Sequence, residues 1–277
     1  MSYRILFCDF IITKYIEYWI YAVSISISIY YLAKKLLSDR NKKNKLLMFI
    51  PFFLSIFFQS FVVYDDINVP IGLLLILLSA IFIFNYYDKM SIKNSAYKGI
   101  IPIGLCLGLL GVVRQDMITY MWGLFFWAMF WAGMADVEGL GLSLLKRAIK
   151  GFKQGVFLTS IIVFVMLLIC LFYPLISIEY VVEGIIAPFY KYRKINLPMP
   201  INIYGILFYL PVLFAITSLI ILIYKNRKQI IRANTPLFWK EMLIINLTLN
   251  IFNYSLLGDS LPFLLPSILL SSLFFIK

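Results

Sequence analysis

Arg114 is the residue of this sequence best suited to chemistry, because it lies between two long apolar runs in GIIPIGLCLGLLGVVRQDMITYMWGLFFWAMFW. Ionisable residues next to apolar membrane spans are costly and therefore indicate function by default. A guanidinium carries a permanent charge and a forked set of donors that suit phosphate oxygens. Arg114 is thus a candidate phosphate ligand; the alternative is that it pairs with Asp116 and caps a short hairpin at the membrane interface.

Carboxylates occur in three turns between apolar runs. Asp65 and Asp66 end one run, Asp116 follows Arg114, and Asp259 lies between the last two runs. A carboxylate at a membrane surface can act as a general base toward a hydroxyl or hold a cation. As the alternative, Asp65 and Asp66 mark a solvated turn, and Asp259 is an ordinary turn residue.

The segment 175–201 combines cations, aromatic residues and prolines in LISIEYVVEGIIAPFYKYRKINLPMPI. This mixture predicts an interfacial helix with an aromatic belt, followed by a stiff extended piece. Lys191 and Arg193 are candidate ligands for an anion, either a lipid headgroup or a phosphosugar. Anchoring to headgroups alone is the alternative.

The elements that position these residues must be membrane helices. Hydrophobic residues make up 62% of the 277 positions and charged residues 14%, whereas soluble domains carry about 25% charge. A soluble fold of this length has too much surface for so few charges. This composition excludes an ordinary cytosolic enzyme, a secreted disulfide scaffold and a disordered tail, and it predicts an all-α, polytopic transmembrane bundle formed by 1–277 as a single domain.

We predict nine spans from apolar runs of roughly 17–25 residues, the length that crosses the hydrocarbon core. The fourth run is shorter, with fifteen residues, and only Arg114, Gln115 and Asp116 separate it from the fifth. Its glycines Gly104, Gly108 and Gly111 lie on nearly one face, which allows close packing against a neighbour. The predicted spans are 17–33, 46–64, 69–87, 99–113, 117–135, 155–174, 202–224, 241–257 and 261–276.

Basic residues orient the predicted spans. If 34–45 is cytoplasmic, strict alternation puts 19 of the 25 Lys and Arg residues inside, as the positive-inside rule requires. The N-terminus then lies outside and the C-terminus in the cytoplasm. Every candidate site residue falls on the outer side, where we expect the loop 175–201 to roof a polar site.

Other site classes have no support in the sequence. The net charge of +12 is spread between apolar runs rather than along a soluble basic face, so it does not indicate nucleic acid. The three cysteines are far apart, and histidine is absent from the sequence, which excludes His-based metal centres and His-dependent triads in this chain. No Walker or Rossmann glycine pattern is present.

Three stretches resemble the GT-C superfamily of polyprenyl-phosphate-sugar-dependent glycosyltransferases, in particular its protein O-mannosyltransferase-like and aminoarabinose-transferase-like members. The strongest is KGIIPIGLCLGLLGVVRQDMITYMWG, which is similar to a Gly-rich helix ending in Arg and a polar residue. FFQSFVVYDDINVPIGLLLILLSAIFIF resembles a span that ends in an acidic outer turn before a Pro-led helix. APFYKYRKINLPMP, with LLGDSLPFLLPS, resembles the outer loop and last-hairpin aspartate of some bacterial members.

The resemblance implies a cell-membrane glycosyltransferase of the cell envelope. Its donor would be a polyprenyl-phosphate sugar drawn from membrane lipid, and its acceptor a hydroxyl of a glycan, lipid or protein. Asp65, Asp66 or Asp116 would take the acceptor proton. Arg114, with Lys191 or Arg193, would bind the departing phosphate, and the need for a divalent metal stays open.

The sequence departs from the family in two places. Nothing before residue 17 matches the first outer loop, which holds the family's catalytic carboxylate, and Pro262 stands where some relatives have a histidine. The outside N-terminus is what truncation by an odd number of spans would give, so we expect a transferase that lacks its N-terminal part, and its activity in isolation stays open. The alternatives are a multi-pass polysaccharide polymerase and, outside the enzymes, a non-catalytic membrane subunit or transporter component.

Overall fold

The computed structural model describes residues 2–39, 52, 53, 55, 68–89, 96–134, 143–173, 177–191 and 239–247. Within these residues the chain is all-helical, and no strand occurs among them. The helices are α1 (Ser2–Asp39), α3 (Asn68–Lys89), α4 (Ala96–Val113), α5 (Gln115–Met134), α6 (Leu144–Phe172) and α7 (Ile178–Lys191), with a further helical segment at 239–247.

Among the residues that the structure describes, three stretches of helix are long and apolar enough to cross a membrane: Tyr15–Leu36, Asn68–Asp88 and Leu145–Phe172. Two shorter apolar stretches, Tyr97–Val113 and Met121–Gly133, lie in α4 and α5. The structure therefore agrees with the prediction of a helical protein associated with a membrane.

The predicted spans 69–87, 99–113 and 117–135 match α3, α4 and α5 closely. The span predicted at 155–174 falls in the C-terminal part of α6, which begins earlier, at Leu144. Lys and Arg are good helix formers, and the hydroxyl of Ser143 accepts from the backbone N–H of Lys146, so the helix extends through the basic segment.

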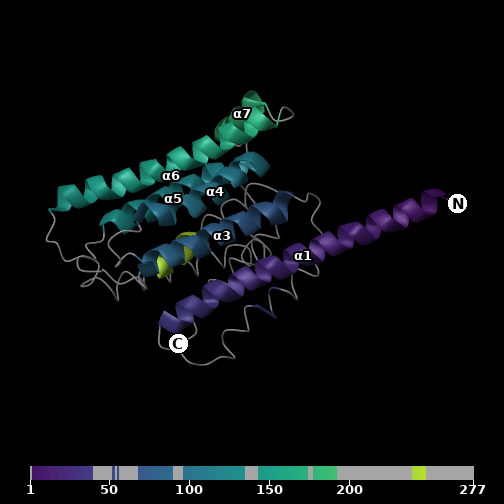
Figure 1. Ribbon diagram of the computed structural model, residues 1–277, viewed down its shortest axis with the longest axis horizontal. Helices are drawn as coiled ribbons and strands as arrows, with labels where there is room; N and C mark the ends of the chain where they lie inside the picture. The colour runs from purple at the N-terminus through teal and green to yellow at the C-terminus, as the bar shows by residue number, and fades with distance from the viewer. Residues whose placement is uncertain are drawn as a thin grey trace, which may run out of the picture.

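The first predicted span, 17–33, falls within the apolar stretch Tyr15–Leu36 of α1, a helix that runs from Ser2 to Asp39. Figure 1 shows the N-terminal part of α1 extending beyond the other helices. The predicted spans 46–64, 202–224, 241–257 and 261–276 lie outside the described residues, except for isolated positions near 52–55 and the helical turns at 239–247. The count of nine and the placement of both termini thus stay predictions.

Contacts between glycines and facing side chains fix the directions of α4, α5 and α6. Going up α4, Gly104, Gly108 and Gly111 meet Ile161, Val165 and Met166 of α6 in rising order, so these helices are parallel. Along α5, Phe126 contacts Gly155 of α6 and the later Gly133 contacts the earlier Gly151. The residue numbers thus run in opposite directions, so α5 is antiparallel to α6 and therefore also to α4. The predicted close packing of the α4 glycine face is confirmed, with α6 as its neighbour.

The tightest helix contact joins α5 to α6. A Cβ on Gly151 would overlap the backbone carbonyl oxygen of Phe130, and a Cβ on Gly133 would overlap the Gly151 backbone. Small residues at facing positions allow the two helix axes to approach closely, as in many membrane helix pairs.

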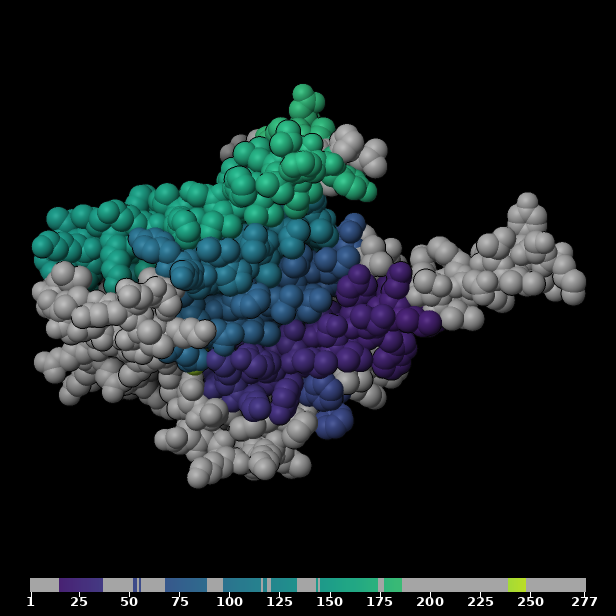
Figure 2. Space-filling view, viewed as in Figure 1, coloured from purple at the N-terminus to yellow at the C-terminus, as the bar shows by residue number. Residues whose placement is uncertain are grey.

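The core is formed by buried side chains of α1, α3, α4 and α5, with contributions from the inner face of α6, from Val181 of α7 and from the segment 239–247. Buried residues such as Ile29, Leu77, Leu107 and Phe125 form one continuous cluster. In Figure 2, α6 forms an outer edge of the molecule, and side chains such as Phe164 on its outer face are largely exposed.

Candidate functional site

Arg114 is the single non-helical residue between α4 and α5. Its backbone N–H donates to the carbonyl of Leu110 (2.7 Å), and its carbonyl accepts from the N–H groups of Met117 (3.1 Å) and Ile118 (3.3 Å). The last bond of α4 and the first bonds of α5 therefore both use Arg114. Since the two helices are antiparallel, this one residue reverses the chain.

The side chain of Arg114 packs against the start of α3. A Cβ added to Gly72 would lie 3.3 Å from Arg114 Cγ and 2.7 Å from Met117 Sδ. The N-terminal turns of α3 and α5 therefore converge beside the half-buried Arg114. The N-termini of α3 and α5 carry partial positive charge, whereas the C-terminus of α4 at Val113 carries partial negative charge, so the permanent charge of Arg114 is the feature of this junction that favours an anion.

Helix α7 packs against the same junction. A Cβ on Gly184 would lie 2.6 Å from Cβ of Gln115, which is 9% exposed. Gln115 also donates from Nε2 to the carbonyl of Val112 (3.1 Å). At the start of α7, the hydroxyl of Ser177 accepts from the N–H of Tyr180 (3.1 Å). The α7 helix thus lies beside the α4–α5 turn, as Figure 1 also shows.

Of the predicted site residues, only Arg114 is described with its side chain. Asp116 is in the first turn of α5 and Lys191 ends α7, but their side chains lie outside the described part of the structure. Asp65, Asp66, Arg193 and Asp259 lie outside the described residues altogether. The structure brings Arg114 to the ends of α3 and α7 and leaves the proposed carboxylates as predictions.

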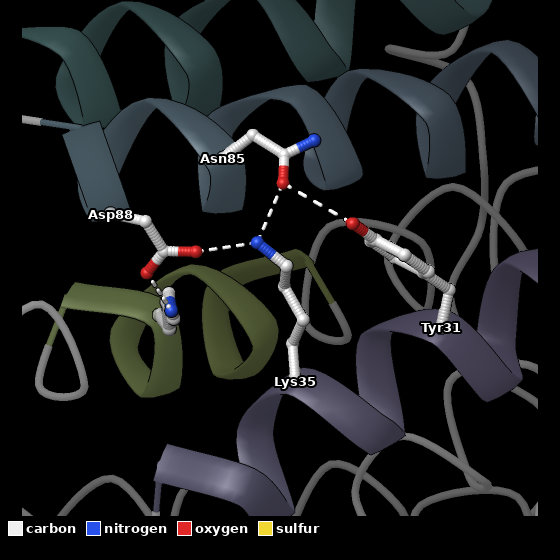
Figure 3. A network of polar contacts seen from close by, with 5 residues as sticks. Tyr31, Lys35, Asn85 and Asp88 are labelled. Atoms are coloured by element: carbon white, nitrogen blue, oxygen red, sulfur yellow. Dashed lines mark hydrogen bonds and ion pairs between the residues drawn. The ribbon is translucent and has the colours of Figure 1, made fainter.

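A second polar cluster joins the C-terminal ends of α1 and α3, at the opposite end of the bundle (Figure 3). Lys35 Nζ donates to Asp88 Oδ2 (2.5 Å) and to Asn85 Oδ1 (2.6 Å). Tyr31 donates to the same Asn85 oxygen (3.3 Å). Asp88 Oδ1 accepts from Lys240 Nζ, so one carboxylate pairs with two lysines.

Lys240 enters this cluster from the helical segment 239–247, and its side chain is 1% exposed. Its ammonium also lies 5.6 Å from the ring centroid of Phe84. A buried ammonium requires a partner charge, because burial of an unpaired ion is costly. Asp88 supplies this charge and connects three segments that are distant in the sequence.

The sequence reasoning missed this cluster and counted its lysines only as loop charges. The available signal was local: Tyr31 and Lys35 lie four residues apart, and Asn85 and Asp88 three apart, so each pair occupies one helix face. Nothing in the sequence indicated that these two faces meet each other or Lys240.

No family model matches the sequence, and neither a curated protein nor a solved structure matches it.

Proposed function

We propose that this chain is a multi-pass protein of the cell membrane that binds the phosphate of a polyprenyl-phosphate sugar and belongs to a GT-C-type glycosyltransferase. The observation that carries this proposal is the position of Arg114. It occupies a helix reversal beside the N-termini of α3 and α5, an arrangement suited to a phosphate.

The proposed topology has nine spans, an outer N-terminus and a cytoplasmic C-terminus. Its support is the contact among Lys35, Asp88 and Lys240, which come from three segments that the topology assigns to the cytoplasm. The antiparallel arrangement of α5 against α4 and α6 fits the same alternation. Arg114 and α7 lie at the other end, which is the outer side in this topology.

In the proposed reaction an acceptor hydroxyl attacks the anomeric carbon of the donor sugar. The bond between this carbon and the phosphate oxygen breaks, and polyprenyl phosphate leaves with the electron pair. A carboxylate from Asp65, Asp66 or Asp116 takes the hydroxyl proton. Arg114, assisted by Lys191 or Arg193, stabilises the charge that grows on the departing phosphate.

The test is donor binding by the purified chain in detergent–lipid micelles that contain excess phosphatidylglycerol. The excess anionic lipid suppresses nonspecific binding of a charged donor. We expect saturable binding of a labelled polyprenyl-phosphate sugar to the wild type. An Arg-to-phosphate contact contributes about 1.5–3 kcal/mol, so Arg114→Ala should weaken binding at least about tenfold.

The matched control is Arg147→Ala, which removes the same charge near the start of α6, at the opposite end from Arg114. It should bind the donor like the wild type. Equal binding by wild type and Arg114→Ala, both with unchanged thermal melting, contradicts the assigned phosphate site. Binding without sugar transfer supports the phosphate site and counts against Asp65, Asp66 and Asp116 as the catalytic base.

A further inference from the structure

We propose that a groove on α6 binds one anionic phospholipid of the bilayer, independently of the Arg114 site. The groove has a volume of about 830 Å³ and is open on one side. Its walls come from the start of α4, the end of α5 and the first half of α6. They are formed by Tyr97, Phe130, Ala148, Ile149, Phe152, Lys153, Val156, Phe157 and Ser160.

The lining fits an acyl chain. Aromatic and aliphatic side chains predominate, and Phe152 (57% exposed) and Val156 (42% exposed) present their apolar surface outward. Tyr97 closes one side through an edge-to-face contact with Phe157, at 5.2 Å between ring centroids. Figure 2 shows α6 at an outer edge of the molecule, where a lipid can reach it.

Positive charge borders the same groove. Lys146, Lys150 and Lys153 follow one another at intervals of four and three residues, which places them on one face of α6. The Lys153 side chain is itself part of the groove wall. Within the residues that the structure describes, no ion pair joins these three lysines to a carboxylate, and α6 contains no acidic residue.

The length of α6 places this charge at the right depth. Its 29 residues extend about 43 Å, whereas the hydrocarbon core is about 30 Å thick. The apolar part, 155–172, is about 27 Å long and fills the core, so the three lysines lie at the level of the lipid phosphates. Their positive charge also opposes the helix dipole, and an anionic headgroup offsets both effects.

The experiment counts lipids retained by the purified full chain in native mass spectrometry, after titration with phosphatidylglycerol or phosphatidylcholine. We expect one phosphatidylglycerol to bind at least about tenfold more tightly than phosphatidylcholine. Each lysine near an anionic surface raises the binding affinity about fivefold. The double variant Lys150→Gln/Lys153→Gln should therefore bind phosphatidylglycerol at least about tenfold more weakly. Arg114→Ala should retain it, which separates this site from the proposed donor site.

Two valine variants test the groove without changing charge. Val156→Trp fills the groove and should abolish the tight site, whereas Val163→Trp, at a similarly exposed position of α6 outside the lining, should retain it. Equal affinity for the two lipids, or equal loss in both valine variants with unchanged melting, overturns the proposal. Displacement of the lipid by millimolar inorganic phosphate also overturns it, because the acyl chain would then contribute nothing.

Discussion

Lys240 donates a hydrogen bond to Asp88 although 152 positions separate the two residues in the sequence. Lys240 is fully buried and Asp88 is 37% exposed, so the pair places a cation in the interior and leaves its partner at the edge. Because Lys35 also pairs with Asp88, one carboxylate fixes the relative positions of α1, α3 and the segment 239–247.

Asp88→Asn should destabilise the protein, since it removes the carboxylate charge that pairs with the buried Lys240 ammonium. Breaking a fully buried pair costs about 3–5 kcal/mol, and partial exposure of Asp88 reduces the expected loss to about 1–3 kcal/mol. Thermal melting in detergent measures the change.

Lys240→Met provides the second variant of a double-mutant cycle, because Met fills similar space without charge. The double variant Asp88→Asn/Lys240→Met should be more stable than the sum of the two single losses predicts. Strictly additive losses would mean that the two side chains do not interact energetically.

Gly151→Ala should separate α5 from α6, because its methyl group would overlap the carbonyl oxygen of Phe130 and backbone cannot move as a flexible side chain does. Overpacking costs about 1–3 kcal/mol, which we expect as a lower melting temperature. Gly123→Ala in α5 is the control, since nothing lies within 4 Å of its added Cβ. Gly123→Ala should be neutral or slightly stabilising, as Ala favours helix over Gly; equal destabilisation by both variants would contradict the packing argument.

Single cysteines at Ser143 and Ser177 test the topology, because these exposed residues precede α6 and α7. In a background with Cys8, Cys106 and Cys170 replaced by Ser, Ser177→Cys should react with a membrane-impermeant maleimide in intact cells. Ser143→Cys should react only after permeabilisation. The reverse pattern would place Arg114 on the cytoplasmic side, and labelling of both in intact cells would show that α6 does not span the membrane.

Gly72→Leu should weaken donor binding nearly as much as Arg114→Ala, because the larger side chain would displace the Arg114 stem and Met117. Gly99→Leu is the matched control at the other end of the α3–α4 pair, where the added side chain meets Tyr86 instead. Donor affinity in the binding assay distinguishes the two variants. Unchanged affinity in a well-folded Gly72→Leu protein would show that the position of Arg114 is not set by this contact.

Hydrophobic length predicted the helices well where apolar runs end sharply. Asn68–Lys89 and Gln115–Met134 differ little from the predicted spans, because charges or turns flank both runs. The predicted span 155–174 lies within α6, but the helix also includes the basic segment before it, since charged residues end an apolar run without ending a helix. The helix within 175–201 was expected and is present as Ile178–Lys191.

The polar sites were harder to predict for a physical reason. Arg114 could be predicted as a candidate site residue from neighbouring sequence alone, because apolar runs flank it directly. The contact between Asp88 and Lys240 was not predicted, because it depends on how distant helices pack. The spacing of apolar residues in the sequence carries no information about that packing. The groove on α6 required the same knowledge of packing, since Tyr97 and Phe130 come from other helices.

The one-residue turn at Arg114 joins α4 directly to α5, with no linker between the two helices. Since Arg114 is the single residue between the two helices, a shift at the end of α4 also displaces the start of α5. Because α7 packs beside Gln115 at this turn and Gly151 packs against Phe130 of α5, a displacement of α5 would change its contacts with both α7 and α6.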